Sequence, residues 1–163
     1  MEYEHFSHEF SPVYTPTSKV LILGSFPSVK SREQCFYYGH PQNRFWKLLA
    51  RLYGEEIPTS IPAKKDLLIR HDIALWDVIA SCEIKGSSDS SIRNVVPNDI
   101  SSLLQQTAIN NIYANGAKAA TLYDKYIYPT TNRPIIKLPS TSPANAAYNL
   151  EKLEMHWQQI VKS

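Results

Sequence analysis

The stretch that decides the fold is Lys19-Val-Leu-Ile-Leu-Gly24, a short and partly β-branched apolar run that stops at a glycine. Such a run is typical of a buried strand. Further apolar runs follow at residues 73–76, 111–114 and 134–138. Because segments of helical character separate these runs, we expect parallel strands in one sheet with helices on both faces. The predicted fold class is α/β, a three-layer α/β/α domain with a four-stranded, mainly parallel central sheet.

Turn residues and apolar spacing place helices between these strands. Gly54 is expected to end the first helix, Pro62 suits the first turn of the second, and Asn98 is a candidate cap for the third. The expected helices cover residues 43–53, 62–71, 99–107, 117–126 and 145–162. Residues 1–17 are predicted to form an irregular lead-in, and the polar segment 86–91 a loop.

Length and composition limit the class of protein. A chain of 163 residues suits one domain, so residues 1–163 are treated as a single domain, and a net charge of +2 neither indicates nor opposes nucleic-acid binding. No apolar stretch approaches the roughly 18–20 residues of a membrane span, and the acidic N-terminus is unlike a signal peptide. Two cysteines cannot build a disulfide scaffold or a four-cysteine metal site. We expect a cytoplasmic, intracellular protein without metal or cofactor.

The ends of the predicted strands indicate where a ligand would bind. Right-handed crossovers bring the carboxyl ends of parallel strands to one edge, where open α/β sheets bind ligands. Here that edge carries residues 24–28, Asp77, Asn115-Gly116 and residues 139–143. The chain has no glycine-rich dinucleotide fingerprint and no P-loop motif. The sequence therefore predicts a site of another kind at this edge.

Three segments, in order along the chain, carry a family resemblance: Gly24-Ser-Phe-Pro-Ser28, Phe36-Tyr-Tyr-Gly-His-Pro-Gln-Asn-Arg-Phe-Trp46 and Leu138-Pro-Ser-Thr-Ser-Pro-Ala-Asn145. Together they resemble the uracil-DNA glycosylase superfamily, most closely its hypoxanthine (deoxyinosine) DNA glycosylase branch. The resemblance implies a uracil-DNA glycosylase-like fold and an enzyme of base excision repair. Such an enzyme flips a deaminated base out of DNA and hydrolyses its N-glycosidic bond, hypoxanthine first. The implied partner is DNA containing deaminated bases; we expect a monomer with no obligate protein partner and no membrane.

The first loop departs from the pattern of other branches of the superfamily. Those relatives carry an Asn or an Asp–Pro pair there, whereas this chain has Ser25-Phe26. In the hypoxanthine branch, positioning of the attacking water is assigned to the Asn of the HPxN motif, which is Asn43 here. Asn43 could orient water by accepting a hydrogen bond from it while donating to a neighbour. An asparagine before an apolar helix is also a common N-cap, and both roles stay open.

Base recognition is expected along the rest of the edge. The resemblance places Tyr38 where a ring stacks on the flipped base, and Asp77 where relatives carry a base-reading residue. The Asp77 carboxylate would accept the N–H on the Watson–Crick edge of hypoxanthine or uracil and repel adenine; alternatively, Asp77 caps a turn. Phe36 is expected either in the core or in the pocket wall. The implied base-binding residues are Gly24, Ser25, Phe26, Tyr38, Asp77 and Asn115.

Residues 139–144 resemble the superfamily's second motif, a loop pressed into the minor groove. Ser140 would contact phosphate, and residues 141–143 would wedge into the space left by the base; an ordinary proline-fixed loop is the alternative. The implied DNA-binding residues are Ser28, His40, Ser140, Thr141, Ser142 and Pro143. Further candidate phosphate contacts are Lys30, Arg32, Arg44 and Arg93, although no spacing distinguishes them from solvated surface charge.

Other functions are compatible with parts of the pattern. A uracil- or mismatch-directed glycosylase would read the same N–H edge, and a damaged-base-binding module would flip bases without cutting them. A hydrolase of free nucleosides would need paired carboxylates, whereas Asp77 alone is placed at the predicted edge. No lysine is placed there as an obvious Schiff-base nucleophile, which favours a monofunctional glycosylase.

Overall fold

A computed structural model describes residues 3–7, 10–26, 36–85 and 92–163. Its central sheet has four strands in the order β3-β2-β6-β7, and each neighbouring pair is parallel. The strands are β2 (Val20–Gly24), β3 (Ile73–Asp77), β6 (Asn111–Asn115) and β7 (Ile136–Leu138). The predicted four-stranded parallel sheet is confirmed, and parallel pairing puts the carboxyl ends of these strands at one edge.

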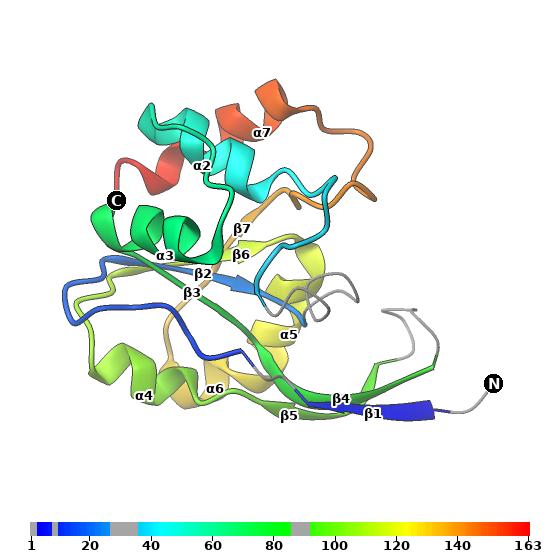
Figure 1. The fold of residues 1–163 in the computed structure, drawn as a ribbon. Coiled ribbons are helices and arrows are strands. Elements are labelled where there is room, and N and C mark those ends of the chain that lie inside the picture. Colours follow the sequence, from blue (N-terminus) through cyan, green and yellow to red (C-terminus); the bar gives the residue numbers. More distant parts are fainter. Residues whose placement is uncertain (1–2, 8–9, 27–35, 86–91) are drawn as a thin grey trace.

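Helices cover both faces of this sheet (Figure 1). On one face lie α2 (Phe45–Tyr53), α3 (Ile61–Arg70) and α7 (Leu150–Trp157); on the other lie α4 (Ile100–Gln105), α5 (Ala117–Tyr126) and α6 (Tyr128–Thr131). The side chains of β2 pack against the helices on both faces of the sheet. Val20 and Ile22 are buried in the core under the first group of helices, whereas Leu21 and Leu23 are buried in the core under the second. A strand buried on both faces reads as one continuous apolar run, which is why its sequence was decisive.

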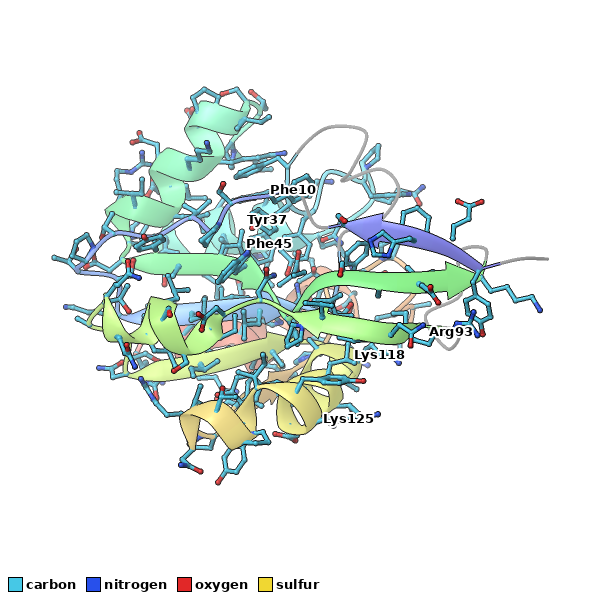
Figure 2. The ribbon with its side chains drawn as sticks, turned by 90° about the horizontal axis from the view of Figure 1, so that it is seen from below. Phe10, Tyr37, Phe45, Arg93, Lys118 and Lys125 are labelled. Carbon is cyan, nitrogen blue, oxygen red and sulfur yellow. The ribbon has the colours of Figure 1, made fainter. Side chains whose placement is uncertain are left out.

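Aromatic rings fill much of the core under α2, α3 and α7. Phe10 packs edge-on against Tyr37 with ring centroids 5.1 Å apart (Figure 2). Phe36 is 5% exposed and stacks on Trp46 at 5.9 Å. Of the two positions considered for Phe36, the structure therefore shows the core.

A second sheet, three-stranded and antiparallel in the order β1-β4-β5, was not anticipated. Its strands are β1 (Tyr3–Ser7), β4 (Ile79–Lys85) and β5 (Arg93–Pro97). The prediction of an irregular lead-in is wrong at residues 3–7, which form β1. The sequence gives no sign of β1 or β5, because most of their residues are exposed and do not alternate between apolar and polar. β4 begins two residues after β3 ends, so the chain passes from the central sheet into the second sheet at residues 77–79.

Most of the helix ends lie close to the predicted capping and terminating residues. Gly54 ends α2 in the left-handed conformation with a φ of 64°. The cap of α4 is Asp99, whose carboxylate accepts the Ser102 N–H at 3.1 Å, and not Asn98. The last helix is shorter than expected: α7 starts after the cap Asn149, and a 3₁₀ turn, Gln158–Ile160, follows it. Within the described residues, none of the helices has both the length and the apolar character needed to cross a membrane.

Candidate active site

The carboxyl edge of the central sheet gathers side chains from distant parts of the chain. Strand register sets Gly24 beside Asp77 and Asn115 beside Leu138. Leu23 pairs with Ala114, so Gly24 and Asn115 follow at the ends of adjacent strands, with Gly24 between Asp77 and Asn115. The loop after Leu138 then brings Thr141 to Asn115, where the Thr141 N–H donates to Asn115 Oδ1 at 3.0 Å. The predicted base-binding positions Gly24, Asp77 and Asn115 are thus neighbours in space.

Gly24 leaves room for two polar side chains at this edge. A methyl group built on its Cα would lie 2.3 Å from Asp77 Oδ1 and 3.0 Å from the Tyr38 hydroxyl oxygen. Asp77 is only 3% exposed, and its backbone carbonyl accepts a hydrogen bond from Asn98 Nδ2 at 2.9 Å. Because a larger residue would displace the carboxylate, Gly24 permits the observed positions of Asp77 and Tyr38.

Tyr38 has a strained backbone and a buried, unpaired hydroxyl. Its φ of 53° lies in the left-handed region, and its ring stacks on Phe45 with centroids 4.2 Å apart. Among the described residues, its buried hydroxyl has no hydrogen-bond partner of normal geometry. An unpaired buried hydroxyl costs about 1–3 kcal/mol, and strained or unpaired groups cluster at functional sites. Tyr38 therefore marks this edge as a candidate site independently of any motif.

The charge state of Tyr38 follows from its surroundings. Burial raises the pKa of Tyr38 far above its ordinary value, the negative Asp77 raises it further, and the nearby Asn115 side chain acts in the opposite direction. The hydroxyl keeps its proton at neutral pH and can donate to a ligand, while Asp77 supplies acceptor oxygens close by. Since Phe45 covers one face of the Tyr38 ring, only the other face is left for the stacking on a base that was predicted.

Asn43 is tied to the protein through its side-chain oxygen. Asn43 Oδ1 accepts the Phe45 N–H at 3.0 Å and the Thr141 hydroxyl at 2.8 Å. Thr141 Oγ1 in turn accepts from Asn115 Nδ2 at 3.1 Å. Asn43 therefore supports the first residue of α2 from one position before the N-cap, Arg44, and at the same time belongs to a hydrogen-bonded chain that reaches the strand edge. The two roles considered for Asn43 are compatible in this geometry.

Thr141 corrects one prediction about the second-motif loop. Its side chain is 0% exposed and is held between Asn43 and Asn115, so it cannot wedge into DNA. The exposed part of the loop begins at Pro143 and continues through Ala144, while Ser142 is half-buried. The sequence predicts Thr141 at the exposed tip because the local pattern does not show that its hydroxyl bonds to Asn43 and Asn115, which are far away in the chain.

Arg44 also has a role that differs from the one considered. Its guanidinium donates to the carbonyls of Ser142 at 2.8 Å and Asn145 at 3.2 Å, and also to that of Tyr148. The Thr141 carbonyl accepts from both Arg44 Nε, at 3.3 Å, and the Arg44 backbone N–H, at 3.1 Å. These bonds use the arginine to hold the second-motif loop, so it is not a free phosphate contact. Sequence reasoning missed this clamp because its partners lie 97–104 residues away.

The other candidate cations are either engaged or outside the described residues. Arg93 donates to Glu83 at 3.0 Å and lies 3.4 Å from the centroid of the Tyr3 ring, within the second sheet (Figure 2). Lys30 and Arg32 lie outside the described residues, and so does the predicted DNA contact Ser28.

The remaining predicted residues lie around the same edge with local partners. The Ser25 carbonyl accepts the Ile79 N–H at 3.1 Å, and the Phe26 ring packs edge-on against Phe6 at 6.5 Å. His40 Nδ1 accepts the Gln42 N–H at 3.1 Å, which leaves Nε2 as the donor of the neutral ring. Ser140 Oγ accepts the Ser142 N–H at 3.1 Å. Their contacts with base or DNA stay predictions.

The chemistry available at the edge comes from amides, hydroxyls and one buried carboxylate. Over residues 3–7, 10–26, 36–85 and 92–163, no group of three or more His, Cys, Asp and Glu side chains could hold a metal ion. The fold and this cluster define a three-layer α/β domain with a polar, amide-rich site at the carboxyl ends of its parallel strands.

Comparison with known proteins agrees with that description. The family model of the Uracil DNA glycosylase superfamily matches residues 11–162, and the chain belongs to this superfamily. It is similar to a hypoxanthine DNA glycosylase of Methanosarcina acetivorans, with 33% identity over 155 residues, 94% of this chain and 96% of that protein. A hypoxanthine DNA glycosylase of Methanosarcina barkeri is 35% identical over 113 residues, 68% of this chain and 71% of that protein.

A solved structure supports the same family at the level of the fold. The solution NMR structure of a Methanosarcina acetivorans protein superposes with a TM-score of 0.79 at 30% sequence identity, covering 96% of this chain and 99% of that one. The resemblance inferred from three short segments is confirmed, and so is the fold class.

Proposed function

We propose that this chain is a monofunctional DNA glycosylase that hydrolyses the N-glycosidic bond of deaminated bases, with hypoxanthine as its first substrate. Two relatives bearing that name, at 33% and 35% identity, support the substrate class. The observation that carries the proposal is the buried carboxylate of Asp77 beside the unpaired hydroxyl of Tyr38, in a domain of this superfamily.

The two polar groups suit the base that would leave. Hypoxanthine and uracil both present an N–H on the Watson–Crick edge, which Asp77 would accept, together with a carbonyl oxygen to which the Tyr38 hydroxyl would donate. In this arrangement Tyr38 meets the base edge-on, in place of the stacking expected from the sequence. Negative charge develops on the base as the bond to C1′ breaks, so a donor close to the base favours departure. Adenine has an unprotonated ring nitrogen on that edge, which would face the Asp77 oxygens unfavourably.

The sugar needs a positioned water more than a strong base. An oxocarbenium-like C1′ is electrophilic enough for a neutral water once the glycosidic bond is largely broken. We assign the holding of that water to Asn43, whose amide is too weakly basic to remove a proton. The water's proton is therefore lost to solvent or to the departing base anion after the bond to C1′ forms. A covalent Schiff-base intermediate needs an amine nucleophile. None is present among the side chains described at the site, which are Asn43, Asp77, Asn115, Tyr38 and Thr141.

The test is single-turnover base release by excess enzyme from duplexes that each contain one inosine, uracil or xanthine. The wild-type chain should release hypoxanthine fastest, and Asn43→Ala should slow release by about a hundredfold or more, the scale of losing one preorganised amide donor. Because a lost cap costs about 1 kcal/mol, thermal unfolding should show a folded variant. Asn110→Ala is a matched control, since Asn110 is exposed and precedes β6 at the opposite edge of the sheet.

Each alternative function has its own outcome. Release of uracil without hypoxanthine would identify a uracil-directed enzyme, and tight binding of an inosine duplex without release would identify a damage-binding module. Full activity of folded Asn43→Ala would remove Asn43 from the mechanism.

A further inference from the structure

Two backbone N–H groups determine the direction of the hydrogen bonds that link Asn43, Thr141 and Asn115 through their side chains. The Phe45 N–H can only donate, so the Asn43 atom 3.0 Å away must be the side-chain oxygen and not the nitrogen. The Thr141 N–H likewise fixes the atom 3.0 Å away as the oxygen of Asn115. The orientation of both amides is therefore set by donors that cannot reverse.

The remaining protons follow from these two orientations. With its oxygen on the Thr141 N–H, Asn115 turns Nδ2 toward Thr141 Oγ1 at 3.1 Å, and that oxygen must accept. The single proton of the Thr141 hydroxyl is then free to donate to Asn43 Oδ1 at 2.8 Å. Thr141 is 0% exposed, so no base, sugar or phosphate competes for this proton.

Both lone pairs of Asn43 Oδ1 are occupied in this arrangement, one by the Phe45 N–H and one by the Thr141 hydroxyl. What Asn43 can offer to a ligand is therefore the pair of N–H bonds on Nδ2. A water that accepts one of these N–H bonds keeps a second lone pair for attack on C1′. This differs from the sequence-based expectation, in which the Asn43 oxygen would accept from the water.

We propose that Thr141 is a positioning residue for the hydrolysis, whose one hydroxyl proton holds Asn43 with its amide N–H bonds turned toward the attacking water. The proposal rests on the proposed function, because it assigns an action through Asn43. Thr141 itself touches neither substrate nor water. Arg44 reinforces the arrangement by holding the backbone carbonyl of Thr141 with two hydrogen bonds.

The test compares Thr141→Val, which keeps the shape and loses the hydroxyl, with Thr141→Ser, which keeps it. Thr141→Val should lower the single-turnover rate constant at saturating enzyme by roughly ten- to a hundredfold, the scale of a misplaced catalytic group. The Kd for an inosine duplex should change little, because Thr141 is buried away from DNA. Thr141→Ser should restore most of the rate. Should Thr141→Val fail to fold, Thr141→Ala also lacks the hydroxyl and takes its place beside Thr141→Ser.

A double variant separates positioning from general structural support. In an Asn43→Ala background, Thr141→Val should cause little further loss, since the residue through which Thr141 acts is already gone. The proposal would be overturned if Thr141→Val released base at the full rate, or if Thr141→Ser lost as much rate as Thr141→Val. It would also be overturned if Thr141→Val lowered the rate as much in the Asn43→Ala background as in the wild-type chain. Failure of the proposed function shows separately, as a wild-type chain that releases no base.

Discussion

At Gly24 the missing side chain is a requirement of the site, because a methyl group there would lie 2.3 Å from an oxygen of Asp77. The consequence is a carboxylate that is almost fully buried at the end of β3, with the unpaired Tyr38 hydroxyl beside it. A ligand N–H would give this buried carboxylate a hydrogen-bond donor in a place that water reaches poorly. We therefore expect the Asp77 carboxylate to determine the substrate preference of the chain.

Asp77→Asn should slow excision of both hypoxanthine and uracil, because the amide keeps an acceptor oxygen but loses the charge. A hydrogen bond to a charged group contributes about 1.5–3 kcal/mol, so a loss of roughly ten- to a hundredfold is expected. The new N–H donor suits the ring nitrogen of adenine and should relax discrimination against it. Single-turnover rates on inosine, uracil and adenine duplexes test this, with the exposed Asp66→Asn as control. Unchanged ratios among the three bases would show that Asp77 does not read the base.

Among the elements, α2 and α3 are joined at their ends by a small polar cluster. Glu55, just after α2, accepts one hydrogen bond from Arg70 and pairs with His71 at the end of α3. Tyr53 stacks on the His71 ring with centroids 4.0 Å apart. Since α2 begins beside Asn43, this cluster holds the far end of the helix that carries part of the site.

Glu55→Gln should lower the melting temperature at neutral pH and leave it nearly unchanged in acid. The hydrogen bond with His71, and then that with Arg70, lowers the pKa of Glu55 below its ordinary value. A depressed pKa in the folded state contributes stability above the unfolded-state pKa, and this stability is lost as the pH falls through the folded-state value. Thermal unfolding from neutral pH to below the ordinary glutamate pKa measures the difference, with the exposed neighbour Glu56→Gln as control. A difference that does not shrink on acidification would contradict this origin of the stability.

For the molecule as a whole, the site combines the carboxyl ends of β2, β3 and β6 with two loops that the fold brings to the same edge. The loop before α2 supplies Asn43 and Arg44, and the loop after β7 supplies Thr141. The second loop is held firmly at its base by Arg44, yet Pro143 and Ala144 stay exposed at its tip. A rigid loop with an exposed tip suits insertion into a duplex.

Replacement of Pro143 and Ala144 by glycine should impair release from a well-paired duplex more than release from a mismatch or a single strand. Flipping a base out of a paired site costs a few kcal/mol of stacking and pairing, which the inserted tip would help to overcome. Unpaired bases have already lost part of this stacking. Single-turnover release of hypoxanthine from the three substrates measures the effect. Equal losses on all three would show that the tip is not a wedge.

The sequence predicts the central sheet well because its strands are buried on both faces, as Leu21 and Ile22 show. It does not predict β1 or β5, whose mostly exposed residues are held by pairing with β4. At the candidate site, the resemblance of the motifs to the family indicates which residues to expect there, namely Asn43, Tyr38 and Asp77. It cannot indicate the left-handed backbone of Tyr38 or the burial of Thr141, since both depend on contacts that local patterns do not encode.

The bond between Asn43 and Thr141 joins residues 98 positions apart, which has a consequence for how the protein is made. A ribosome delivers the first loop long before the second, so the Asn43 amide remains without its threonine partner until residue 141 has emerged. Closing so long a loop costs entropy that only the assembled sheet and helices repay. The amide can thus take its working orientation only in a chain that is already folded, and a partly synthesised chain lacks it.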